Sequence, residues 1–140
     1  MQMNYLTILI CAVTAMVIGF IWYGPLFGKI WRQMMEGDTK SIEQNEAIKK
    51  SMWIAYLAQL ILSIITAWTL LYFISNWTNF TASFVGIAVC AWFGFVMTTN
   101  ASAALWSGRP KKIAWKIFSI SSGAQFVTFI VFGLIIGWLI

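Results

Sequence analysis

The stretch MWIAYLAQLILSIITAWTLLYFI, residues 52–74, contains no charged side chain and is long enough to cross a bilayer as one helix. Three further stretches, residues 5–23, 82–106 and 114–138, have a similar length and apolar character. Backbone polar groups in lipid must be satisfied within their own segment, so runs of this length are predicted to be helices rather than strands. We therefore predict an all-α integral membrane four-helix bundle, formed as a single transmembrane domain over residues 1–140.

The composition indicates that lipid is the solvent of this chain. Hydrophobic residues make up 61% of it and charged residues 9%, against about 25% charged in ordinary soluble domains. The chain contains no His, which removes the usual ligands of haem and zinc and the commonest general base. No acid or base lies deep in a predicted span, whereas proton-coupled carriers depend on one. Because no activated nucleophile, metal-ligand cluster or phosphate-binding Gly loop is present either, we expect no enzyme activity, no cofactor and no metal.

The positive charges are confined to two of the gaps between the spans. All 9 Lys and Arg residues lie within residues 29–50 or 109–116. Short cytoplasmic loops carry an excess of Lys and Arg, so the gap at residues 24–51 and the third gap are predicted to be cytoplasmic, with both termini outside. The net charge of +5 then reflects topology, and nucleic acid is not an expected partner.

The gap at residues 24–51 is predicted to contain a short helix lying in the membrane interface. Pro25 is suited to the first turn of such a helix, and apolar residues then recur at helical spacing. Ser41 forms a capping-box pattern with the Gln three residues later. A second helix is therefore expected to run from Ile42 straight into the second span.

Uncharged polar residues gather in the predicted inner halves of the second, third and fourth spans. The candidates for a common role are Gln59, Asn100, Ser122 and Gln125. Amides are costly in hydrocarbon unless they are paired. At matched depth these side chains could hydrogen-bond between helices, at about 1 kcal/mol per bond, or they could line a water-filled pocket open to the cytoplasm. The sequence leaves both interpretations open.

Small residues recur at four-residue spacing along the third and fourth spans. The pattern comprises Gly86, Cys90, Gly94, Thr98 and Ser102 in the third span, with Gly133 and Gly137 in the fourth. Such spacing lets helices approach closely, either within one bundle or between subunits. Because four helices of this length bury little surface against one another, we expect a homo-oligomer.

The most specific string in the chain is GFIWYGPLFGKIW, residues 19–31, and a second signal is Asn100 followed by Gly108-Arg109-Pro110. Together they resemble a family of small bacterial four-helix membrane proteins classed only as a domain of unknown function. The resemblance covers the whole chain, and it implies four helices in a bacterial inner membrane. It implies no activity and no substrate.

The motif residues have plain structural roles open to them. Trp22 and Tyr23 are expected to anchor the span at the membrane interface, because amphipathic rings prefer the headgroup level. Pro25 and Gly28 are expected to shape the turn that follows. Trp31 is then placed on the apolar face of the interfacial segment.

Three functional hypotheses follow. The first is a non-enzymatic, oligomeric membrane protein that acts in the lipid bilayer through packing or partner binding. The second is a small passive channel or carrier with a cytoplasm-facing polar pocket. The third is an anionic-lipid-binding module whose headgroup contacts are Arg109, Lys111 and Lys112. Arg109 is planar, always charged and able to bind bidentately, and in this alternative Trp22, Tyr23 and Asn100 lie around the same site.

Overall fold

The computed structural model describes residues 4–36, 42–77 and 83–140, and all regular structure within them is helical. The elements in order are α1 (Tyr5–Ile21), η1 (Trp22–Leu26), α2 (Gly28–Glu36), α3 (Ile42–Asn76), α4 (Phe84–Ala91), η2 (Trp92–Met97), α5 (Thr98–Leu105) and α6 (Lys111–Leu139). The two elements η1 and η2 are π-helices, which continue α1 into α2 and α4 into α5.

Among the described residues, four helical segments are long and apolar enough to cross a membrane, which confirms the predicted fold class. They are Tyr5–Leu26, Trp53–Asn76, Phe84–Leu105 and Lys111–Leu139. The short helix expected after the first span is present as α2, and α3 runs from Ile42 into the second span as expected. The predicted capping residue Ser41 lies outside the described residues.

The prediction that Pro25 opens the helix after the first span is wrong. Pro25 lies inside the π-helix η1, and α2 begins at Gly28. The backbone N–H of Phe27 donates to the carbonyl of Trp22 at 2.9 Å, which closes a turn one residue wider than an α-turn. Proline has no backbone N–H to donate within a helix. Pro25 is accommodated in the wide π-turn at the end of the first span and does not start a new helix.

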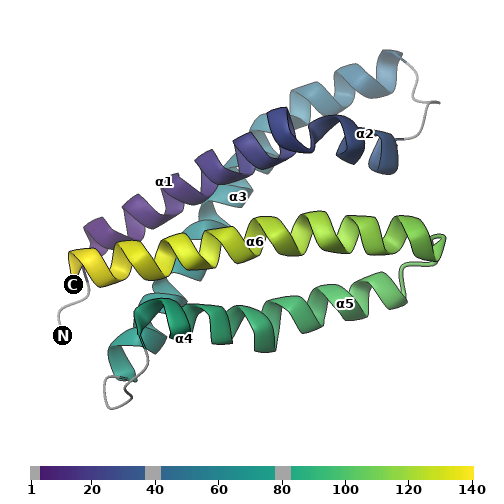
Figure 1. The fold of residues 1–140 in the computed structure, drawn as a ribbon. Coiled ribbons are helices and arrows are strands. Elements are labelled where there is room, and N and C mark those ends of the chain that lie inside the picture. The colour runs from purple at the N-terminus through teal and green to yellow at the C-terminus, as the bar shows by residue number, and fades with distance from the viewer. Residues whose placement is uncertain (1–3, 37–41, 78–82) are drawn as a thin grey trace.

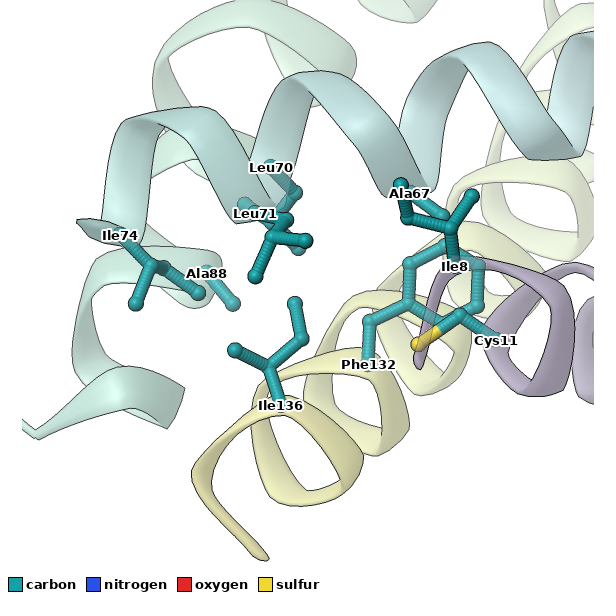
Figure 2. Close-up of a cluster of buried hydrophobic side chains, with 9 residues drawn as sticks. All are labelled: Ile8, Cys11, Ala67, Leu70, Leu71, Ile74, Ala88, Phe132 and Ile136. Carbon is teal, nitrogen blue, oxygen red and sulfur yellow. The ribbon is translucent and has the colours of Figure 1, made fainter. Parts of the chain in front are cut away.

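The buried core lies toward the end of the bundle where the two termini are found, called the terminal end below. Figure 2 shows its side chains converging from α1, α3, α4 and α6. They are Ile8, Cys11, Ala67, Leu70, Leu71, Ile74, Ala88, Phe132 and Ile136. All four spans therefore meet at the terminal end.

The opposite end carries α2 and the turn between α5 and α6, and it is called the basic end because of its Lys and Arg residues (Figure 1). Here α3 is not enclosed: every described residue from Trp53 to Gln59 is exposed, on all faces of the helix. The bundle is consequently packed at one end and open at the other.

Two glycines of α6 hold α4 close to it at the terminal end. A Cβ atom on Gly133 would lie 2.8 Å from the Cα atom of Val85, and one on Gly137 would lie 2.7 Å from the ring of Phe84. Gly133 has no room for a larger residue because the nearby atoms are backbone, whereas a larger residue at 137 would require the Phe84 ring to move. This G-x-x-x-G pair therefore packs helices within one chain.

The small residues of the third span behave differently. A Cβ atom on Gly94 would meet nothing within 4 Å, and Cys90, Thr98 and Ser102 are exposed. This stripe does not contact another helix among the described parts of the chain. Small residues at four-residue spacing therefore form a contact with another helix on α6, but they form an exposed face on α4–η2–α5.

Candidate functional site

Asn100 joins α5 to α6 at the centre of a polar network. Its amide nitrogen donates to Ser122 Oγ at 3.1 Å and to Gln125 Oε1 at 2.6 Å. Ser122 is buried, and its carbonyl oxygen also accepts from the indole of Trp92 at 3.2 Å. Three of the four polar candidates from the sequence are therefore hydrogen-bonded to one another between helices.

Gln59 does not reach this network. It lies on α3, where the Ser63 hydroxyl donates to the Gln59 carbonyl at 2.8 Å and lies 3.5 Å from the Gln59 amide nitrogen. These bonds stay within one helix. Gln59 and Gln125 instead line the same pocket from different helices.

That pocket, called the large pocket below, has a volume of about 790 Å³ and lies between α1, α3 and α6. Its lining is mostly aliphatic and aromatic, with polar groups contributed by Tyr23, Tyr56, Gln59, Ser63, Thr66, Gln125 and Thr128. Among the described residues that line it, none is Lys, Arg, Asp or Glu. Phe132 lines the large pocket and also belongs to the buried core, so the pocket borders the core. It extends from there toward the basic end, where α3 is exposed.

A second pocket of about 180 Å³, the small pocket, lies between α5 and α6. Asn100 and Arg109 both line it, together with Ser107 and Ser121. Since Gln125 lines the large pocket and accepts a hydrogen bond from Asn100, the network forms part of the wall between the two pockets.

Trp22 of the motif at residues 19–31 joins the end of the first span to α6. The Trp22 indole donates to the carbonyl of Ile120 at 2.9 Å, and its ring occupies the space that a Cβ atom on Gly123 would need, 3.0 Å away. The Tyr23 ring meets that of Trp31 edge-on, with centroids 4.7 Å apart.

Gly28 allows the backbone at the start of α2 to lie close to that of η1. It is buried, and a Cβ atom there would lie 2.6 Å from the Tyr23 carbonyl oxygen. Backbone cannot move aside as a flexible side chain can, so only glycine fits at the start of α2, beside η1. Pro25 itself is exposed.

Of the three predicted cationic contacts, the structure brings one to a pocket. Arg109 lines the small pocket, whereas Lys111 and Lys112 are exposed in the first turn of α6 and line neither pocket. Asn100 and Arg109 therefore share a site. Trp22 lines neither pocket, and Tyr23 lines the large one.

A protein-family model matches residues 6–137. The chain belongs to the family described as "Protein of unknown function (DUF1761)". This confirms the resemblance to a family of unknown function, and membership assigns no substrate or partner. No curated protein and no solved structure matches the chain.

Two polar residues that line the large pocket in this family member, Thr66 and Thr128, were not singled out from the sequence. Thr66 follows Gln59 by seven residues, and Thr128 follows Gln125 by three. These are the spacings of one helix face, so the two polar stripes could have been found. Nothing in the sequence pattern would have found the indole bonds of Trp22 and Trp92 to α6, because they depend on how the helices meet.

Proposed function

We propose that this chain is a membrane-embedded binding protein for a small uncharged polar or amphipathic molecule, which it holds in the large pocket. The observation that carries the proposal is that two amides, Gln59 and Gln125, line one pocket of about 790 Å³ from separate helices. Ligand sites are mostly apolar clefts of about 300–1,000 Å³ with a few polar groups that fix orientation. The large pocket has that character and size.

The chemistry of the lining favours an uncharged ligand. An ion brought into a low-dielectric site needs a partner charge, and the lining offers only amides, hydroxyls and aromatic rings. Gln and Ser side chains both donate and accept hydrogen bonds, so they suit hydroxyl or amide groups of a ligand. Tyr23 and Tyr56 add amphipathic rings that can cover its apolar part.

The proposal includes a non-enzymatic role in a bacterial inner membrane, with the basic end on the cytoplasmic side. The positive-inside pattern supports that orientation. The absence of His from the sequence, and of Lys, Arg, Asp and Glu from the described residues that line the pocket, supports binding or passive carriage over catalysis.

A second candidate function is assembly into a homo-oligomer through the uncovered face of the third span. Phe93 and Phe95 are 60% and 69% exposed there, beside Cys90 and Gly94. Small residues on a membrane helix allow close approach of another helix. Oxidative crosslinking through Cys90 in native membranes tests this candidate: a dimer band supports it, and a monomer with Cys90 shown to be reactive contradicts it.

The test of the large pocket uses two dyes with the same aromatic body. N-phenyl-1-naphthylamine is uncharged, and 8-anilinonaphthalene-1-sulfonate carries one negative charge. Binding to the full chain in nanodiscs is measured by calorimetry against empty nanodiscs. The neutral dye is expected to bind about tenfold or more tightly than the anionic one.

A matched pair of variants locates the binding. Thr128 lines the large pocket and Thr98 lies on the uncovered face, and each donates to the carbonyl four residues before it, at 2.8 and 2.7 Å. Thr128→Trp should fill the pocket and abolish binding of the neutral dye, while Thr98→Trp should leave it unchanged. Equal binding by the two variants, or equal affinity for the two dyes, would contradict the proposal.

A further inference from the structure

Three hydroxyl groups in the lining of the large pocket use their protons within their own helix. Ser63, Thr66 and Thr128 each donate to the carbonyl oxygen four residues earlier, at 2.8, 2.9 and 2.8 Å. A hydroxyl whose proton is engaged in this way can still accept a hydrogen bond through its oxygen, but it has no proton left to donate. These three side chains therefore offer a ligand acceptors only.

Gln125 is held in the opposite sense. Its Oε1 accepts from the amide nitrogen of Asn100 at 2.6 Å, and Asn100 lines the small pocket and not the large one. The oxygen and the nitrogen of a primary amide point in different directions, so an oxygen turned toward Asn100 leaves the nitrogen for the large pocket, which Gln125 lines. Among the described parts of the chain, nothing accepts a hydrogen bond from that nitrogen.

Asn100 keeps the Gln125 amide in this orientation. An amide nitrogen has two protons, and Asn100 directs one to Ser122 Oγ at 3.1 Å and the other to Gln125 Oε1. Gln59, across the large pocket, is not held in this way. Its amide nitrogen lies 3.5 Å from Ser63 Oγ, which is too long a distance to fix the amide. Of the two amides, Gln125 is therefore the one with a defined donor side.

We propose that the large pocket selects ligands that carry a carbonyl group, with Gln125 as the donor to that group and Asn100 as the residue that positions Gln125. This selection rests on the proposed function, because it concerns the molecule held in the same pocket. An amide N–H without a partner is costly in an apolar surrounding, and a carbonyl oxygen accepts from it. A small amide or hydroxy ketone also has an N–H or O–H group for the acceptors on α3 and α6.

The test uses two probes of the same shape, 2-acetylnaphthalene and 2-isopropenylnaphthalene, which differ only in a carbonyl oxygen replaced by a CH₂ group. Each one displaces N-phenyl-1-naphthylamine from the full chain in nanodiscs, and empty nanodiscs correct for partition into lipid. The wild type is expected to bind the ketone about fivefold more tightly than the hydrocarbon, which is what one neutral hydrogen bond contributes.

Three variants assign the roles through the ratio of the two affinities. Gln125→Leu removes the donor, so the ratio should fall to about one. Asn100→Leu keeps Gln125 but leaves its amide free to turn, so the ratio should fall to about twofold. Gln59→Leu removes an amide of the same size from the other side of the pocket and should keep the ratio at about fivefold. Partial unfolding weakens both probes equally, so the ratio reports the orientation of Gln125 and not the stability of the fold.

Each contrary result overturns a defined part of the proposal. A wild-type ratio near one, with Thr128→Trp abolishing binding of both probes, would refute selection for carbonyl groups and leave the large pocket as a binding site. An unchanged ratio in Asn100→Leu would refute its positioning role. A ratio lost in Gln59→Leu and kept in Gln125→Leu would refute Gln125 as the donor. No displacement by either probe, together with equal affinity for the neutral and anionic dyes, would overturn the proposed function and this selection with it.

Discussion

Replacing Asn100 with Leu removes the amide that joins α5 to α6 and leaves the side-chain volume nearly unchanged. Two bonds are lost, those of 3.1 Å to Ser122 and 2.6 Å to Gln125. Hydrogen bonds between membrane helices contribute about 0.6 kcal/mol on average and about 1.7 at most. Two of them give roughly 1–3 kcal/mol.

The burial of the two acceptors refines that range. Ser122 is 4% exposed, so its hydroxyl gains no water in place of the lost bond. Gln125 lines the large pocket, where it can be solvated or meet a ligand. We therefore expect a loss of about 2 kcal/mol in the free energy of unfolding, most of it from the Ser122 bond.

The assay is unfolding of the full chain by sodium dodecyl sulfate in mixed micelles, followed by tryptophan fluorescence. A double-mutant cycle with Ser122→Ala should give a coupling energy of about 0.5 kcal/mol or more, as expected for directly contacting residues. Thr99→Val is the control, because Thr99 bonds only to the Phe95 carbonyl of its own segment. If Asn100→Leu stays within about 0.5 kcal/mol of the wild type, or if Thr99→Val loses as much, the network does not hold α5 to α6.

Four further substitutions separate internal packing from the open parts of the bundle in the same unfolding assay. Gly133→Ala should destabilise the fold by about 1–3 kcal/mol, because the new Cβ would lie 2.8 Å from backbone. Gly94→Ala should be neutral or should stabilise the fold by up to about 1 kcal/mol. The reverse order of stabilities would mean that α4 and α6 do not pack as described. Trp22→Phe keeps an aromatic ring but loses the donor to the Ile120 carbonyl, so we expect a loss of about 1 kcal/mol, and an unchanged stability would refute that bond. Gln59→Leu should change the free energy of unfolding by less than about 0.5 kcal/mol, since the hydrogen bonds of Gln59 stay within α3. The same variant should weaken binding of the neutral dye, because Gln59 lines the large pocket. A destabilisation equal to that of Asn100→Leu would mean that Gln59 makes an interhelical contact.

The spans were predictable because lipid imposes one solution on a long apolar segment. Residues 52–74 needed no tertiary information to be assigned, since an unpaired backbone in hydrocarbon is too costly for anything but a helix. Matched depth was equally informative for the polar residues. Asn100, Ser122 and Gln125 were grouped from their positions alone, and the structure joins them with hydrogen bonds.

The π-helices could not be predicted from periodicity. Each one begins at a tryptophan, Trp22 or Trp92, whose indole donates to a backbone carbonyl of α6. The extra residue in such a turn rotates the helix beyond it, so where the side chains point after Trp92 depends on a contact between distant segments.

The polar candidates differ in the contacts that they make in the structure. Asn100 and Ser122 join helices, Gln59 lines an open pocket, and Gln125 does both. The sequence could not separate these roles. The position of a residue along a span predicts its depth in the membrane, but it does not predict that α3 diverges from the other helices at the basic end. That divergence follows from a core confined to the terminal end.

Water access to the large pocket can be measured by thiol labelling, and a pocket that binds a polar solute must be reachable from water. In a chain with Cys11 and Cys90 replaced by Ala, Thr128→Cys and Thr98→Cys would each be treated with a membrane-impermeant thiol reagent in inverted vesicles, with Ser107→Cys in the α5–α6 turn as the reactive standard. Thr128 lines the large pocket and Thr98 lies on the uncovered face of α5. We expect labelling at position 128 at a rate close to that at position 107, with labelling at position 98 far slower. Labelling at 128 that is no faster than at 98 would mean that the large pocket is filled by lipid or another helix, and it would contradict a solute-binding role.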